Sequence, residues 1–116
     1  MGIGTINPEN KLDVCGFIRG TEVIVESDWC DYVFSDSYRL PSLAEQARFI
    51  AQKGHLMNFD SEKAMNGELK VADVSKRQQK TIEEIMLYLI EMEHEISDLK
   101  NTIQLLESKL NNTLKD

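Results

Sequence analysis

A heptad repeat of apolar residues in the C-terminal part of the chain constrains the fold more than any other feature of the sequence. With Ile82 at position a, every a and d position is apolar over about four heptads. These positions are occupied by Ile82, Ile85, Leu89, Met92, Ile96, Leu99, Ile103, Leu106 and Leu110. The repeat predicts a coiled coil, because the stripe of a helix docked on a globule has a period of 3.6 and drifts over this length.

The predicted helix, residues 74–116, contains neither Pro nor Gly. At 1.5 Å per residue it spans roughly 60 Å, which is too long for the preceding residues of the same chain to cover. We therefore expect the seam to be covered by other copies of the chain, and the a and d residues are the predicted oligomer interface.

The seam alone does not settle the number of chains. Ile at a with Leu at d favours parallel dimers, Ile at both positions favours trimers, and the layers here are mixed. Position e holds Met86 and Leu114, and position g holds Tyr88 and Thr102. A trimer buries more of positions e and g than a dimer does, so these flanks lead us to expect a parallel homotrimer.

The segment from Ile85 to Ile90 is apolar on every side of the helix, including Leu87 at f and Ile90 at b. A helix that is apolar all round is covered all round. We expect a helix over residues 43–53, or the aromatic residues before it, to pack outside this part of the coiled coil. Ser75 with Gln78 has the spacing of a capping box and predicts that the long helix begins there.

Three segments make up an α+β chain, in which short N-terminal β strands lead to a small α-containing unit and then to the long coiled-coil helix. Residues 1–34 are the strand segment, residues 35–73 the small unit with one short helix, and residues 74–116 the trimerisation helix. Residues 11–14 alternate between polar and apolar, and residues 23–25 are β-branched, as strands are. Such short strands need partner strands, which we expect from other chains.

The short helix of the middle segment has clear boundaries. Ser42 and Glu45 have the spacing of a capping box, and Gly54 is a typical helix end. These signals predict a helix over residues 43–53.

Half of the aromatic residues lie within ten positions of one another. They are Trp29, Tyr32, Phe34 and Tyr38. The group is either the hydrophobic core of the small unit or an exposed patch that contacts a ligand such as a glycan.

The composition excludes several functions. A net charge of −7 provides no basic patch for nucleic acid, and no run of apolar residues is long enough for a membrane span. Cys15 and Cys30 are too far apart for a CxxC motif, so we expect two separate thiols, or a bridge if the protein is extracellular. We expect no metal site, no cofactor and no catalytic residues.

Several stretches resemble bacterial and phage tail-fibre-like proteins. Gly2 to Thr5, Asn7-Pro8, Lys11 to Val14 and Gly16 to Arg19 are similar to a "GIGT…P…KLxVxGxI" repeat that lies just before the C-terminal domain of such proteins. Trp29 to Phe34 and Tyr38 to Leu43 are similar to their "WPDYVF…YKLPSL" segment, and Lys80 to Glu91 to their "KIEELTLYLIE" helix.

The resemblance implies the C-terminal module of a homotrimeric fibrous surface or tail-fibre protein, outside the cell or on a virion tail. Such modules are similar to the intramolecular chaperones of endosialidase-type tailspikes, which align three chains so that an upstream β-rich shaft can fold. The implied partners are two further copies and the upstream shaft of the same chain. Any export signal is expected upstream, because the first residues lack the regions of a signal peptide. The alternative is a fibre tip that binds a cell-surface receptor or glycan.

Some of these relatives also cleave themselves with a serine in an "SDxRxK"-like motif. Ser35 and Asp36 match the start of this motif, but Arg39 is one position late and the Lys is missing. A serine nucleophile needs a base, so we expect a turn here and no enzymatic activity.

Overall fold

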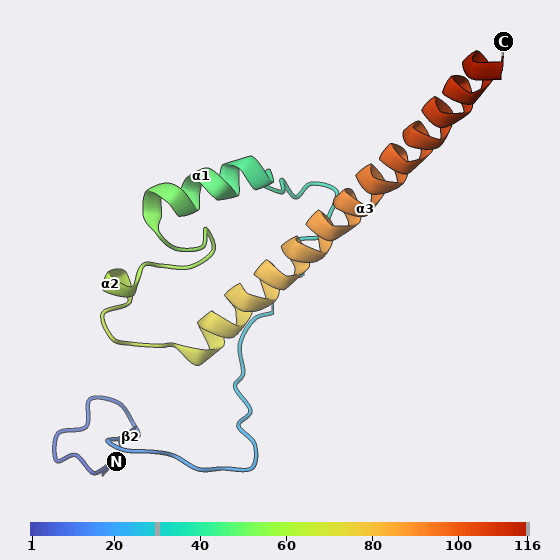
Figure 1. Cartoon of the computed structure of the whole chain (residues 1–116). Helices are drawn as coiled ribbons and strands as arrows, with labels where there is room; N and C mark the ends of the chain where they lie inside the picture. Colours follow the sequence, from blue (N-terminus) through green and yellow to red (C-terminus); the bar gives the residue numbers. More distant parts are fainter. Residues whose placement is uncertain (30, 116) are drawn as a thin grey trace.

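The computed structural model describes residues 1–29 and 31–115 and is elongated, with extents of 90 × 32 × 29 Å. Its axis is helix α3, Val71–Lys115, whose 45 residues are about 68 Å long at 1.5 Å per residue. The rest of the chain lies beside the N-terminal half of α3, and the C-terminal half extends alone (Figure 1).

The other elements are small. Strands β1 (Gly2–Ile3) and β2 (Asp13–Val14) pair in parallel, and helices α1 (Leu43–Lys53) and α2 (Glu62–Met65) precede α3. The predicted α+β chain with a long C-terminal helix is confirmed at this level, while the parallel homotrimer stays a prediction. Cys30 is not among the described residues. The bridge between Cys15 and Cys30, one of the two alternatives for the cysteines, therefore lies outside the part of the chain that the structure describes.

The N-terminal strands close a short loop. Ile3 pairs with Val14, and the Asp13 carboxylate accepts hydrogen bonds from the main-chain amides of Glu9 and Asn10. The predicted strand over residues 23–25 pairs with no strand in the described part of this chain, so it stays a prediction that depends on partner strands from other chains. A β-branched run favours extended backbone, but a strand requires a partner.

Helix α1 has the predicted boundaries. The Ser42 hydroxyl accepts from the Glu45 amide at 3.1 Å, and the Glu45 carboxylate accepts from the Ser42 amide at 2.8 Å. Gly54 ends the helix in the left-handed region, at φ 75°. Both ends are therefore determined by local hydrogen bonding and backbone conformation.

A second short helix, α2, was not expected in residues 35–73. Ser61 caps it by accepting from the Ala64 amide at 3.1 Å. It ends at Asn66, whose φ of 52° lies in the left-handed region, and Gly67 follows at φ 73°. One turn of helix has too few residues for a periodic apolar pattern, so its only signals were the cap and the turn.

Helix α3 begins at Val71, earlier than the predicted start at residue 74 and earlier than the Ser75 cap. The Val74 amide donates to the Lys70 carbonyl at 2.9 Å, so the first turn is already helical there. Ser75 lies inside the helix and caps nothing. The last residue before α3 that disfavours helix is Gly67, and nothing from Val71 onward interrupts the helix.

Few side chains are buried in the single chain. Val33, at 3% exposure, is the most buried apolar side chain among the described residues, and Tyr88, Glu83 and Glu84 are also buried. None of the helices within residues 1–29 and 31–115 combines the length and apolar content needed to cross a membrane, in agreement with the sequence.

Candidate assembly interface

The predicted interface residues form one exposed stripe along α3. Their side chains are 45–61% exposed, from Met92 at the lower value to Leu99 at the upper. The full set is Ile82, Ile85, Leu89, Met92, Ile96, Leu99, Ile103, Leu106 and Leu110. The a and d positions therefore lie together on one face and are left uncovered by the chain itself.

The C-terminal part of α3 has no tertiary support of its own. Every residue from Glu91 to Lys115 is exposed. Isolated helices are marginal in water, and most helical stability in proteins comes from packing an apolar face. Burying the exposed half of one Leu or Ile side chain contributes about 1 kcal/mol, so a partner on this stripe would stabilise the helix at each layer.

The opposite face of α3 is held by the chain's own loop after α1. The Asn58 amide group donates to Thr81 Oγ1 at 3.0 Å and to Glu84 Oε1 at 2.6 Å. The Thr81 hydroxyl also donates to the Arg77 carbonyl at 2.8 Å. In the heptad register these helix residues occupy positions c and g, away from the a and d seam.

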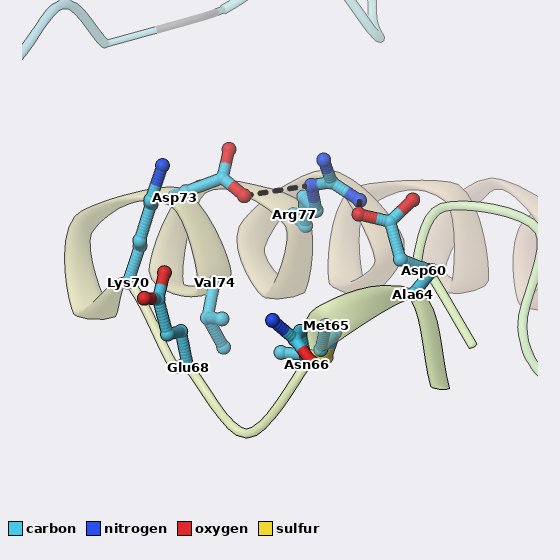
Figure 2. A pocket seen from close by; sticks show the side chains of 9 residues that line it. All are labelled: Asp60, Ala64, Met65, Asn66, Glu68, Lys70, Asp73, Val74 and Arg77. Carbon is cyan, nitrogen blue, oxygen red and sulfur yellow. Dashed lines mark ion pairs between the residues drawn. The ribbon is translucent and has the colours of Figure 1, made fainter. Parts of the chain in front are cut away.

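Arg77 ties the segment around α2 to the start of α3. Its guanidinium lies 3.1 Å from Asp73 and 3.4 Å from Asp60, and it donates to the Asn58 carbonyl at 3.3 Å. Figure 2 shows Arg77 between the two carboxylates, beside a hollow of about 500 Å³ between α2 and α3. Because Asp60, Asp73 and Arg77 of its lining pair with one another, this side of the hollow has the character of a packing gap with a polar rim.

Higher on α3, Tyr88 joins the helix to the start of α1. Its hydroxyl donates to the Pro41 carbonyl at 2.6 Å and accepts from the Gln46 amide group at 3.3 Å. Pro41, just before helix 43–53, and Gln46 within it contact this side of α3, while the coiled coil around which the helix was expected to pack stays a prediction. Leu87 is half-buried as expected, but Ile90 stays exposed, because the covering contacts end at Tyr88.

The aromatic group is divided between two environments. The rings of Tyr32 and Tyr38 lie 5.7 Å apart at 53°, with Lys80 Nζ 5.6 Å and 6.0 Å from their centroids. Trp29 and Phe34 are more than half exposed. The cluster is therefore not a closed core, and the buried side chain in this segment is Val33, which lies between Tyr32 and Phe34 in the sequence.

The surroundings of Tyr38 keep its phenol neutral. Burial raises the pKa of Tyr38 to about 12, and the nearby Glu84 carboxylate adds to the effect. Burial also raises the pKa of Tyr88. Desolvation disfavours a charged phenolate, and a negative neighbour disfavours it further.

Two acidic residues of α3 are buried although the heptad register places them at b and c, positions that face water in a simple coiled coil. Glu84 is 2% exposed and accepts from Asn58, while Glu83 is 8% exposed and one of its carboxylate oxygens has no hydrogen-bond partner among the described residues. In the sequence, the apolar Leu87 at position f indicated that this face of α3 is covered. No sequence pattern indicated that Asn58 and Arg77 form the contacts here.

The partial cleavage motif forms a turn. Ser35 Oγ lies 3.0 Å from Ser37 Oγ and accepts from the Ser37 amide at 3.4 Å. Arg39 pairs with Glu45 at 2.8 Å instead of turning to the serine. The hydroxyl of Ser35 therefore has a second hydroxyl as its neighbour and forms no hydrogen bond with a basic side chain of the described residues.

No group of three or more His, Cys, Asp or Glu side chains within the described part of the chain is placed to hold a metal ion. Comparison with protein-family models, with curated proteins and with solved structures finds no match for this chain.

Proposed function

We propose that this chain is a trimerisation and folding module of a fibrous surface or tail-fibre protein, acting as an intramolecular chaperone for residues upstream. The observation that carries the proposal is the exposed a and d stripe on one face of α3. The other face is occupied near Tyr88 and Glu84 by the chain's own segments. A helix with one covered face and one long apolar face is suited to binding copies of itself.

The residues at flanking positions e and g support a trimer, but fewer of them do so in the structure than the sequence alone indicated. Met86 and Leu114 at position e are exposed and available to a partner. Tyr88 at position g contributes nothing to this argument, because its hydroxyl is bonded to Pro41 of the same chain. The preference for three chains over two thus depends mainly on Met86 and Leu114 at position e, because the mixed a and d layers do not decide between two and three chains.

A coiled coil at the end of a fibre chain would promote folding of the shaft. Intertwined β fibres depend on non-local pairing between chains, which forms slowly and leaves strand edges exposed. Joining the chains through α3 raises their effective concentration before the strands must pair. The resemblance of residues 1–95 to tail-fibre-like proteins supports this role.

The mass of the protein in solution tests the proposal. Light scattering should give about three times 13.3 kDa at micromolar chain concentration. A monomer would overturn the proposed assembly. A dimer would keep the seam as the interface but overturn the trimer.

A second candidate function is binding of a receptor or glycan at a fibre tip, and the exposure of Phe34 favours it. Aromatic rings that stay in water are suited to stacking on a ligand. If this function holds, Phe34→Ala should abolish binding to a glycan array without changing the assembled mass. If binding is unchanged by the substitution, or if the wild-type protein binds nothing, Phe34 is not a ligand contact.

A further inference from the structure

We propose that residues 21–29, here called the arm, bind to the first turns of α3 in a neighbouring copy of the chain. This inference rests on the proposed assembly and names a second contact within it. The arm would join each chain to the next at the N-terminal end of the coiled coil, where the heptad seam is weakest.

The arm has the pattern of a strand without a partner. Val23, Val25 and Trp29 alternate with acidic residues at Glu26 and Asp28. No backbone-to-backbone hydrogen bond involves residues 17–29, so most of the polar groups of this main chain are available, with the Val23 amide bonded to the Glu22 carboxylate. Extended segments with one apolar face bury that face against another surface.

The apolar side of the arm lies beside the start of α3. Val23, Val25 and Trp29 line one wall of a hollow of about 250 Å³, and Val71 and Ser75 are part of the other. This contact within the chain leaves the arm poorly covered, since Trp29 remains 61% exposed and Val23 is exposed further. A second surface is needed to remove these side chains from water.

The position of the hollow indicates a second copy as the occupant. In the heptad register Val71 is at d and Ser75 is at a, so the hollow is continuous with the seam. A helix that packs in parallel register along the seam brings its own first turns to this place. Ser75 and Gln78 weaken the seam here, so apolar side chains of the arm would replace the missing core residues.

Charge complementarity supports the same occupant. The arm carries Glu22, Glu26 and Asp28, while the first turns of α3 carry Lys76 and Lys80. No salt bridge to either lysine is formed within the described part of the chain. The acidic arm and the basic first turns of a neighbouring α3 would therefore attract each other over a distance as the chains approach, and association would become slower as salt increases.

The fluorescence of Trp29, the single tryptophan of the chain, reports on the arm. We compare wild-type protein with the Leu99→Asp variant as the unassembled reference, measuring mass, emission wavelength and acrylamide quenching together. Assembled protein should show a shift to shorter wavelength and a loss of quenching. An assembled protein whose Trp29 is as accessible as in Leu99→Asp overturns the arm contact and leaves the proposed assembly standing. Wild-type protein that stays monomeric overturns both.

Cross-linking tests whether the contact is between chains. In a Cys15→Ser, Cys30→Ser background, one chain carries Ser27→Cys and a second, longer tagged chain carries Ser75→Cys. After the two are mixed through unfolding and refolding, only a contact between chains yields a disulfide that joins a tagged to an untagged chain. Asp28→Cys in place of Ser27→Cys is the matched control, because residue 28 alternates to the other side of the arm.

A mixed disulfide that forms with Ser27→Cys and is several-fold weaker with Asp28→Cys supports the arm contact. Equal yields from both variants, or no mixed product from assembled protein, would show that the arm does not reach its neighbour's α3. Ile24→Ser and Val25→Ser provide a further pair: only Val25→Ser should lower the Tm of the assembled protein.

Discussion

The hydroxyl of Tyr88 donates a 2.6 Å hydrogen bond to the main-chain carbonyl of Pro41, and this contact turns a heptad g position toward the chain's own small unit. Gln46 of α1 completes the arrangement by donating to the same oxygen. Around Tyr88 the outer face of α3 is thereby occupied from within the chain, whereas the a and d face is left uncovered.

Removing this hydroxyl should loosen the small unit without affecting the seam. Tyr88→Phe leaves the Pro41 carbonyl without its donor, so the free energy of unfolding should fall by about 1 kcal/mol at fixed chain concentration. Urea unfolding followed by circular dichroism measures this change, and the assembled mass should stay the same. Tyr32→Phe is the control, because the Tyr32 hydroxyl makes no hydrogen bond with the described residues. Equal losses for the two variants would argue against a role for the contact with Pro41.

A charge in the seam should prevent assembly, whereas the same charge elsewhere on α3 should not. Leu99→Asp places one carboxylate per chain in a core layer of the proposed coiled coil, which costs several kcal/mol unless the chains separate. Leu105→Asp is the matched control, because Leu105 is 57% exposed, close to the 61% of Leu99, but lies at position c. Light scattering should give a monomer for Leu99→Asp and the wild-type mass for Leu105→Asp. The reverse result would mean that the heptad register is wrong.

The loop after α1 should depend on one amide side chain. Asn58→Ala removes the donor to Thr81 and to the buried Glu84 carboxylate, and it should reduce the free energy of unfolding by about 2 kcal/mol, because hydrogen bonds to charged groups are the stronger ones. Asn101→Ala, on the exposed part of α3, is the control and should stay close to wild type. Chemical unfolding of both variants measures the difference. A loss no greater than that of Asn101→Ala would contradict the role of this contact.

Alkaline pH should destabilise the protein through Tyr38. The pKa of Tyr38 is raised from 10.0 to about 12, so the folded chain holds the phenolic proton more tightly than the unfolded chain does. The stabilisation is fully present below pH 10, and it is lost as the pH rises from 10 to about 12. The tyrosinate absorbance of wild type minus Tyr38→Phe should therefore titrate near pH 12.

Tyr88→Phe serves as the control for this titration, because burial also raises the pKa of Tyr88. Each variant lacks one tyrosine, so the part of the tyrosinate absorbance curve that is missing in that variant belongs to the residue that was replaced. A difference spectrum for Tyr38 with its midpoint at the ordinary value of 10.0 would show that its ring is more hydrated than the structure indicates.

Local signals predicted the elements that depend on neighbours in sequence. Helix α1 begins after Ser42 and ends before Gly54, as its capping box and glycine predicted. The start of α3 was placed too late, because the capping pattern of Ser75 also fits the interior of a helix. The strand at residues 23–25 stays a prediction, because β propensity reports a preference for extended backbone and says nothing about whether a partner strand from another chain is present.

The sequence by itself determined the long helix and its apolar seam, since a period of 3.5 residues is a property of the chain alone. It also indicated that something covers α3 near Leu87. Only the tertiary structure decided what does so: Asn58 meets Glu84 and Pro41 meets Tyr88 across separations of 26 and 47 residues. Contacts between residues so far apart in the sequence depend on how the intervening loops close, and the spacing of residues in the sequence does not determine this closure.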